Sequence, residues 1–362
     1  MTRLADPLAL TRGPAWKNRF MLAPLTNQQS HADGTLSDEE FHWLTMRAQG
    51  GFGLTMTCAA HVQQSGNAFA GQLGIFGDQH LEGLTRLADA LKAAGTVSSV
   101  QLHHGGMRCP KELAGDVVAP SDDAETGARA LTTAEVEQLR DDFIAGALRA
   151  QKAGFDGVEI HGAHGYILCA FLSTQYNRRD DRYGGSLENR ARLTLEVLDG
   201  IRAACRPDFQ VGLRLSPERF GMELAEIRDL AAEVMAGGKL DYLDMSLWDV
   251  FKTPMDEGFA ERDLLGWFTD LPRNGTKLGV AGKLMTAAQS QETIDRGCDF
   301  AVIGRAAILR HDFPDRVLAD AGYVSPATPV SEAHLRAEGL SPSFVQYMRN
   351  WKGFVEEAES AA

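Results

Sequence analysis

The chain has 362 residues, of which 44% are hydrophobic and 23% charged, a composition typical of globular proteins with a large core. Its formal net charge of −13 at pH 7 argues against a nucleic acid or an anionic membrane surface as the main partner. A local basic pocket for a small anion remains compatible with this charge.

The N-terminus contains no continuous apolar signal region, and no later stretch reaches the length needed to span a membrane. The five cysteines lie far apart, so no C-x-x-C pair is available for zinc or an iron–sulfur cluster. An odd number of cysteines suits free thiols in a reducing compartment. We therefore expect a cytoplasmic protein without a metal site.

Short apolar runs alternate with segments of helical spacing along the chain. Residues 8–18 could form a hairpin that closes one end of a barrel, and eight predicted strands follow, at 19–24, 53–58, 96–102, 155–160, 210–215, 240–245, 277–281 and 300–303. Helices are expected from Ser37, over 81–91, from Thr133, and over 186–204, 224–235, 263–268 and 286–296. The helix from Thr133 is expected to turn inward the side chains of Val136, Leu139, Phe143, Ile144 and Leu148.

This alternation predicts an α/β fold, a single (β/α)8 TIM barrel with an N-terminal hairpin and loop insertions. An open doubly wound sheet is the competing fold, but no Gly-x-Gly-x-x-Gly motif follows the first predicted strand. We assign the barrel to residues 1–321.

The tail, residues 322–362, differs from the barrel in character. Apolar side chains recur in it at helical spacing, at Phe344, Tyr347, Met348, Trp351, Phe354 and Val355. We expect a C-terminal helical tail packed on its own barrel. The alternative is a tail that reaches a neighbouring subunit of a homo-oligomer, with Arg336 and Arg349 as candidates for entering the neighbour's site.

Sites of TIM barrels lie at the C-terminal ends of the strands, and a phosphate pocket is common after the seventh and eighth strands. Here those two strands run into Gly282-Lys283 and Gly304-Arg305. Glycines let the backbone approach an anion, the following helices direct N–H groups at it, and an arginine pairs with it in bidentate fashion. Tight turns and a carbonyl cap would also explain these residues, but two such ends on adjacent strands favour a phosphate site.

Arg214 ends the fifth predicted strand and is expected to point into the barrel mouth. Burying a cation alone is costly, so it needs an anionic partner. Either a structural Asp or Glu, or a flavin that becomes negative on reduction, would serve. Gln101 carries the donor and acceptor that a flavin's pyrimidine edge requires, although an isolated buried glutamine is commonly just a structural residue.

The fourth predicted strand ends in His161, His164 and Tyr166. The histidines could ligate zinc, but a third ligand and a carboxylate behind them are not evident. Two donors that converge on a carbonyl or phenolate oxygen fit better. Tyr166, whose phenol is ordinarily protonated at neutral pH, is a candidate general acid.

Taken together, these strand ends resemble the Old Yellow Enzyme family of FMN-dependent ene-reductases. The resemblance extends from Asn18-Arg-Phe-Met-Leu-Ala-Pro-Leu-Thr26 to Gly304-Arg-Ala-Ala-Ile-Leu-Arg-His-Asp-Phe-Pro314. Its most specific parts are Gly157-Val-Glu-Ile-His-Gly-Ala-His-Gly-Tyr166 and Asp181-Arg-Tyr-Gly-Gly-Ser-Leu-Glu-Asn-Arg190. The resemblance implies a TIM barrel with tightly bound, non-covalent FMN across its mouth and NAD(P)H as co-substrate.

The resemblance also implies a role for each residue at the strand ends. Ala23, Pro24, Leu25 and Thr26 would line one face of the isoalloxazine ring, and Thr26 would also border the substrate. Ala59 and Gln101 would bond the pyrimidine edge, and Arg214 would stabilise the reduced flavin. Gly282, Lys283, Gly304 and Arg305 would hold the phosphate. His161 and His164 would bind the substrate oxygen beside the flavin, and Tyr166 would deliver a proton.

Some positions depart from the family pattern. Cys58 stands where relatives carry an acidic residue, Asn27 and Gln28 stand where they often place Arg or Tyr, and residues 309–312 replace an Asn-Pro pair. The role of His103 is left open. The altered pair after Thr26 puts the shape of the substrate pocket in doubt.

We predict an NAD(P)H-dependent ene-reductase that acts on small electrophilic alkenes, namely α,β-unsaturated carbonyl or nitro compounds. Hydride would come from flavin N5 and the proton from Tyr166. Two alternatives remain: an FMN-barrel reductase of nitroesters or nitroaromatics, and a non-redox barrel enzyme that acts on a phosphorylated substrate.

Overall fold

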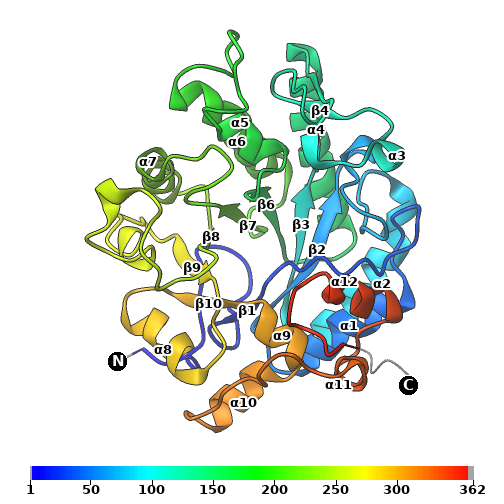
Figure 1. Ribbon diagram of the computed structural model, residues 1–362, viewed down its shortest axis with the longest axis vertical. Helices are drawn as coiled ribbons and strands as arrows, with labels where there is room; N and C mark the ends of the chain where they lie inside the picture. Colours follow the sequence, from blue (N-terminus) through cyan, green and yellow to red (C-terminus); the bar gives the residue numbers. More distant parts are fainter. Residues whose placement is uncertain (1, 358–362) are drawn as a thin grey trace.

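A closed barrel of parallel strands forms the centre of the protein, seen in a computed structural model that describes residues 2–357 (Figure 1). Around the barrel the strands follow the order β1-β10-β9-β8-β7-β6-β3-β2. Their bounds are β1 (Phe20–Leu22), β2 (Leu54–His61), β3 (Val97–His103), β6 (Gly157–Gly162), β7 (Gln210–Leu215), β8 (Tyr242–Ser246), β9 (Lys277–Ala281) and β10 (Phe300–Ile303). The predicted TIM barrel is therefore confirmed, and β7, β9 and β10 have the predicted bounds.

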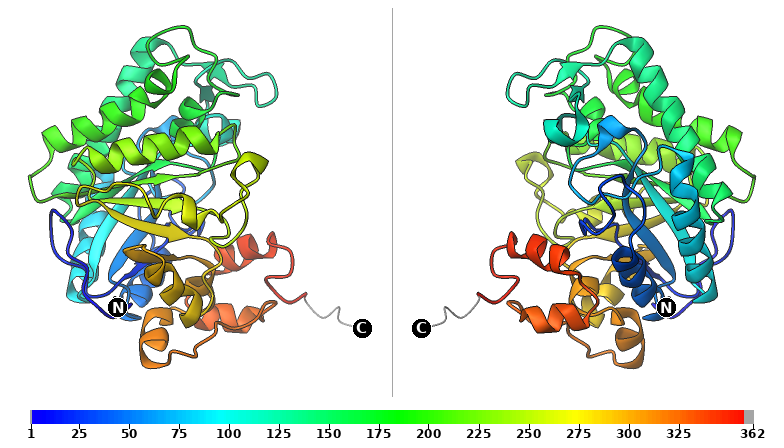
Figure 2. Two further views of the ribbon diagram at one scale, coloured as in Figure 1. Left: turned by 90° about the vertical axis from the view of Figure 1, so that its left-hand side faces the viewer. Right: turned by 90° about the vertical axis from the view of Figure 1, so that its right-hand side faces the viewer.

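Helices on the outside of the barrel connect its strands (Figures 1 and 2). The longer ones are α1 (Asp38–Gln49), α2 (Leu81–Ala93), α4 (Thr133–Lys152), α6 (Leu187–Ala204), α7 (Leu224–Ala236) and α8 (Ala287–Asp295). Shorter ones are α3 (Lys111–Ala114), α5 (Ile167–Leu172), α9 (Arg305–Leu309) and α10 (Phe313–Ala319). Between β3 and α4 the chain also forms a separate two-stranded sheet, β4 (Val118–Ala119) and β5 (Arg129–Ala130).

The start of α4 corrects a detail of the sequence analysis. The residue that caps the helix is Thr132, one position before the expected Thr133. Its side chain accepts a hydrogen bond from the backbone N–H of Glu135, and the Glu135 carboxylate accepts one from the Thr132 N–H. This reciprocal capping box satisfies two otherwise unpaired donors and stabilises the helix by about 1 kcal/mol.

Two further expectations for the helices were wrong. Leu148 is 39% exposed, because the buried stripe of α4 continues through Ala147 and Ala150. The helix expected over 263–268 is only a 3-10 turn, Leu265–Trp267. The Asp263 side chain accepts a hydrogen bond from the Gly266 N–H at the start of this turn.

The N-terminal segment plugs the barrel at the N-terminal ends of its strands. The expected hairpin is reduced to one antiparallel bridge between Leu8 and Trp16. The buried Trp16 ring packs edge-on against Tyr242 at 5.6 Å and Phe300 at 4.9 Å. A Cβ on Gly279 would lie 2.0 Å from the Phe300 ring, so only glycine leaves room for this aromatic plug. The barrel can therefore open only at its opposite end.

The described part of the tail lies against its own barrel, at one edge of the molecule (Figure 2). It contains α11 (Glu332–Ala337) and α12 (Pro342–Arg349). The Phe344 ring packs against Trp43 of α1, with 5.5 Å between the ring centroids. The helix expected to reach Val355 ends earlier, at Arg349, and Gly353 beyond it takes a left-handed conformation.

No helix within residues 2–357 is both long and apolar enough to cross a bilayer. The five cysteines are all buried free thiols.

Candidate active site

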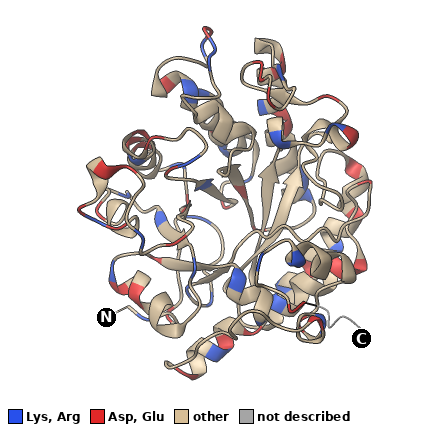
Figure 3. Ribbon diagram, viewed as in Figure 1, with Lys and Arg blue, Asp and Glu red and all other residues tan. Residues whose placement is uncertain are grey.

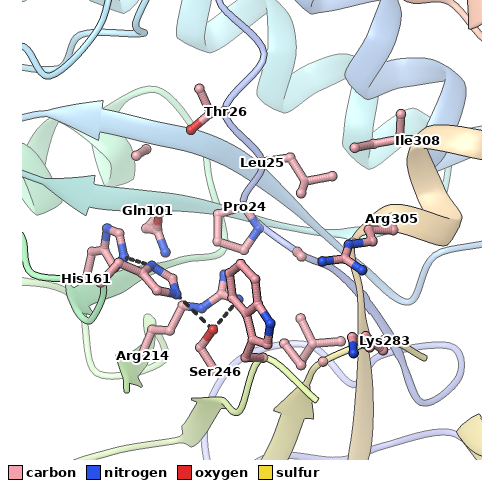
Figure 4. A pocket seen from close by; sticks show the side chains of 18 of the residues that line it. Pro24, Leu25, Thr26, Gln101, His161, Arg214, Ser246, Lys283, Arg305 and Ile308 are labelled. Atoms are coloured by element: carbon pink, nitrogen blue, oxygen red, sulfur yellow. Dashed lines mark hydrogen bonds between the residues drawn. The ribbon is translucent and has the colours of Figure 1, made fainter. Parts of the chain in front are cut away.

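The C-terminal ends of the strands open into a cavity of about 400 Å³ (Figure 4). All of the site residues named from the sequence line it: Ala23, Pro24, Leu25, Thr26, Ala59, Gln101, His161, His164, Tyr166, Arg214, Gly282, Lys283, Gly304 and Arg305. Because the ends of parallel strands meet at one edge of a barrel, the fold brings together residues that are far apart in the sequence.

The order of the strands gives the cavity two opposite ends. In the closed barrel β6 lies across from β10, and β3 lies across from β9. His161, His164 and Tyr166 therefore face Gly304 and Arg305 across the mouth, as the positions of His161 and Arg305 show in Figure 4.

The two histidines bond to each other. Nε2 of His161 lies 2.9 Å from Nδ1 of His164, and Nε2 of His164 lies 2.8 Å from the hydroxyl oxygen of Ser246. Removal from water lowers the pKa of His164 to about 3 and lowers that of His161 well below its ordinary value. Both rings are therefore neutral, and each has a single N–H. The two rings can both donate to one ligand oxygen only if that oxygen takes the place of the hydrogen bond between them.

Tyr166 lies beside this pair. Its ring centroid is 5.2 Å from that of His161 and 4.4 Å from that of His103. Burial raises the pKa of the phenol, whereas the nearby Arg108 guanidinium lowers it by a smaller amount. The phenol therefore remains protonated at neutral pH. His103 itself does not line the cavity, and its Nδ1 lies 3.0 Å from Nε2 of Gln72.

Below the cavity floor, Arg214 has a carboxylate partner. Its Nε lies 3.2 Å from Oδ2 of Asp244, and both side chains are buried. Beside them, Nε2 of Gln101 donates to Oε1 of Glu159 at 2.8 Å, which leaves the Gln101 carbonyl oxygen for another partner. Desolvation, together with the charge of Asp244, raises the pKa of Glu159 to about 8. The structural partner considered for Arg214 is thus present.

At the opposite end, the backbone at Gly282 approaches its neighbours closely, since a Cβ there would lie 2.8 Å from the backbone nitrogen of Asp249. At Gly304 a Cβ would meet nothing closer than 3.6 Å, so the backbone is open to the cavity. α9 begins directly at Arg305, but α8 begins only at Ala287. The helix expected over 286–296 is confirmed as α8, which Thr286 caps at its N-terminus.

The two cations at this end differ. Nζ of Lys283 lies 3.0 Å from Oδ2 of Asp249. The Arg305 guanidinium rests between the rings of Trp248 and Trp351, 5.8 and 5.5 Å from their centroids, and has no carboxylate partner within residues 2–357. Arg305 is therefore the cation at this end that remains available for an anionic ligand.

The chemistry of this lining fits FMN. Ala23, Pro24 and Leu25 form an apolar wall for a ring, Gln101 provides an amide, and Arg305 lies beside the open backbone of Gly304, where a phosphate would bind. In the part of the chain that the structure describes, no group of three or more His, Cys, Asp or Glu side chains could hold a metal ion.

Several lining residues were not named from the sequence, among them Phe69, Arg108, Phe220, Ser246, Trp248, Tyr347 and Trp351. Ser246 is the last residue of β8, so inspecting the end of the sixth predicted strand would have identified it. Glu159 and Asp244, which are buried, could also have been found from the sequence, because each is an acidic residue within an otherwise apolar predicted strand. The remaining residues come from loops and the tail, whose paths the sequence pattern does not predict.

The departures from the family pattern lie outside the cavity lining. Asn27 is buried and donates to the Glu40 carboxylate at 3.1 Å, and Ser30 and the Cys58 thiol surround the same carboxylate. Gln28 does not line the cavity either. After α9, Arg310 and His311 pair with Glu338 of the tail. These substitutions therefore change residues that pack behind the site, and they do not change the lining of the cavity.

Comparison with known proteins agrees with this geometry. The sequence model of the NADH:flavin oxidoreductase / NADH oxidase family matches residues 4–261. The chain is 36% identical over 318 residues to the probable NADH-dependent flavin oxidoreductase YqiG of Bacillus subtilis, covering 84% of this chain and 85% of that protein. It is 35% identical to the NADH:fumarate oxidoreductase of Klebsiella pneumoniae, covering 88% of this chain but only 36% of that longer protein.

Among solved structures, the old yellow enzyme homologue from Zymomonas mobilis superposes with a TM-score of 0.79 at 27% identity, covering 92% of this chain and 96% of that one. The chain therefore belongs to the NADH:flavin oxidoreductase / NADH oxidase family, the Old Yellow Enzyme family of oxidoreductases that use FMN with NAD(P)H as reductant.

Proposed function

We propose that this protein uses NAD(P)H to reduce the activated C=C bond of α,β-unsaturated carbonyl or nitro compounds. One observation supports the proposal: a phenol and two imidazole rings lie at one end of the cavity, opposite a pair of glycines and an arginine that has no carboxylate partner within residues 2–357. FMN bound there would supply the redox chemistry, with NAD(P)H as the source of the hydride and the β-carbon of the alkene as its acceptor.

The chain's contribution at the first end is to hold the cofactor. Gly282, Gly304 and Arg305 bind the phosphate, with Lys283 beside them. Ala23, Pro24, Leu25 and Thr26 line the cavity and would cover one face of the flavin ring. Ala59 and Gln101 bond the pyrimidine edge. Arg214, already paired with Asp244, keeps positive charge close to the position where negative charge appears on reduction.

His161 and His164 bind the carbonyl or nitro oxygen of the substrate. The oxygen replaces the direct bond between the rings and accepts hydrogen bonds from Nδ1 of His164 and Nε2 of His161. His161, whose Nδ1 has no partner within residues 2–357, carries its single proton on Nε2 in this complex. Neutral rings suit this role, because each retains one N–H and adds no charge before the reaction. As hydride reaches the β-carbon, negative charge grows on the oxygen, and donors already in place stabilise it.

Tyr166 completes the addition by donating its phenolic proton to the α-carbon. Its raised pKa keeps the proton on the phenol until a carbanion-like carbon forms beside it. Hydride and proton together saturate the C=C bond, and solvent restores the proton to the phenolate. We place the reaction in the cytoplasm, where five unpaired cysteines would remain reduced.

Anaerobic turnover of the FMN-loaded protein tests this proposal. With NADPH or NADH as reductant, 2-cyclohexenone should be converted to cyclohexanone, identified by gas chromatography, with one nicotinamide oxidised per alkene reduced. A nitroester and a nitroaromatic in parallel assays test the alternative reductase activity. The His161→Ala/His164→Ala variant should retain FMN and lose enone reduction. Protein that oxidises NAD(P)H only with the nitroester or the nitroaromatic, or that does not bind FMN, would overturn the proposal.

A further inference from the structure

The charges around the cavity do not balance. The chain is acidic overall, and acidic and basic side chains are interspersed over its outer helices (Figure 3). The described residues that line the cavity nevertheless include Arg108, Arg214, Lys283 and Arg305, and neither Asp nor Glu. Arg214 forms an ion pair with Asp244, and Lys283 forms one with Asp249. Neither aspartate lines the cavity. Two arginines, Arg108 and Arg305, are left for ligands.

These two arginines lie at different ends of the cavity. Arg305 follows β10, where the phosphate is proposed to bind. Arg108 ends the 3-10 turn Gly106–Arg108 that follows β3, and β3 lies across the barrel from β9. A single phosphate at the β9–β10 end cannot pair with both arginines. The second arginine therefore points to a second anionic group, at the end of the cavity that receives the substrate.

Arg108 is held in place by the residues proposed to carry out the reaction. Its guanidinium carbon lies 5.1 Å from the centroid of the Tyr166 ring and 5.8 Å from that of Phe220. One N–H donates to the backbone carbonyl of His164. The two aromatic faces and this bond restrict the orientation of a side chain that would otherwise move freely in solvent.

Most of the hydrogen-bonding capacity of Arg108 is unused. A guanidinium carries five N–H groups, and here one of them has an acceptor within residues 2–357. No carboxylate oxygen of those residues lies within 4.0 Å of the guanidinium. A solvated surface arginine would share these properties, but Arg108 lines the cavity beside both His164 and Tyr166.

We propose that Arg108 binds a carboxylate on the electron acceptor, so that the preferred substrates are α,β-unsaturated carbonyl compounds that carry an anionic group close to the alkene. This inference rests on the proposed function. The phosphates of NAD(P)H are a second source of negative charge, but a ribose separates them from the reacting ring. Arg108 contacts the two residues that hold the reacting atoms, which favours an anion only a few bonds away.

A binding measurement tests the proposal without turnover. 4-Hydroxybenzoate and its methyl ester are titrated into the oxidised holoenzyme, and binding is followed by the change in flavin absorbance. We expect Arg108→Gln to weaken binding of the acid by about 10- to 100-fold, the range for a charge-assisted hydrogen-bonded pair, and to change binding of the ester by less than about twofold. Arg108→Lys should lose part of the effect, since it keeps the charge without the bidentate geometry.

A kinetic measurement uses a matched pair of acceptors, (E)-4-oxo-2-pentenoate and its methyl ester. Arg108→Gln should lower kcat/KM for the acid by a similar factor and leave the ester nearly unchanged. Arg219→Gln is the matched control. Arg219 is also exposed and stacked on an aromatic ring, that of Trp248 at 5.0 Å, but it does not line the cavity. This control should leave the acid-to-ester ratio unchanged.

Two results would overturn the inference. Equal losses for acid and ester would mean that Arg108 acts through Tyr166 rather than on a carboxylate. A loss confined to NAD(P)H affinity, measured in flavin reduction alone, would assign the anion to the nucleotide. If the wild-type protein reduces neither acceptor, the proposed function fails, and the hydroxybenzoate titration still decides whether Arg108 binds a carboxylate.

Discussion

The hydroxyl oxygen of Ser246 lies 2.8 Å from Nε2 of His164. The same oxygen lies 3.4 Å from Nη2 of Arg214, which can only donate a hydrogen bond. Ser246 therefore accepts from Arg214 and directs its own hydrogen towards His164. That leaves the proton of the His164 ring on Nδ1, the nitrogen that faces His161. Ser246 thus orients His164 for its proposed role as a donor to the substrate oxygen.

We expect Ser246→Ala to weaken phenol binding to the holoenzyme by about 5- to 10-fold, because it removes one hydrogen bond worth about 1 kcal/mol and releases the His164 tautomer. The measurement is a titration with 4-hydroxybenzaldehyde followed by flavin absorbance. Ser246→Thr keeps the hydroxyl and should restore most of the affinity. Equal affinity in the alanine variant and the wild type would show that Ser246 does not set the tautomer.

Replacement of Tyr166 by Phe should separate the two halves of the reaction. It removes the proton donor and preserves the ring that packs against His161 and Arg108. Oxidation of the reduced enzyme by an enone should slow by about 100- to 10,000-fold, the usual contribution of a general acid. Reduction by NAD(P)H should change far less. Stopped-flow absorbance measures both rates, and equal losses in the two would refute the role of Tyr166.

The phosphate role of Arg305 predicts weaker cofactor binding in Arg305→Gln. Loss of a charge-assisted pair should raise the Kd for FMN by about 10- to 100-fold. Flavin released on dilution is measured by its fluorescence. Arg316→Gln is the control, because this exposed arginine of α10 pairs with Asp312 and neither residue lines the cavity. Unchanged FMN retention in Arg305→Gln would place the phosphate elsewhere.

The buried Glu159 gives the protein a pH-dependent stability. Its pKa rises from 4.5 to about 8 on folding, so the folded protein keeps a proton that the unfolded chain releases. Stability is therefore fully present below pH 4.5 and is lost as pH rises towards 8. Glu159→Gln imitates the protonated form and can still accept the hydrogen bond from Gln101. The urea midpoint of the variant minus that of the wild type should increase as pH rises from about 5 to 8. A difference that does not change with pH would contradict the raised pKa of Glu159.

The periodicity of the sequence determined the fold and which strand-end residues lie together at the site. The period of apolar residues is a local property, so β7, β9 and β10 could be bounded without knowledge of their neighbours. Once eight parallel strands are predicted, closure of the barrel places their C-terminal ends together, whatever the distance along the chain. That single geometric consequence brought His161, Arg214 and Gly304 to one cavity.

Only the tertiary structure decided how those residues pair. The bond between His161 and His164, the contact from Ser246 and the partnership of Arg214 with Asp244 depend on the register of adjacent strands and on side-chain rotamers, and neither leaves a periodic signal. The position of Arg108 depends on the path of a loop, which is set by its contacts with distant residues. Local sequence thus determined which strand-end groups line the cavity. Long-range packing decided their partners and the lining residues that loops and the tail contribute, because both depend on distances between segments that are remote in the chain.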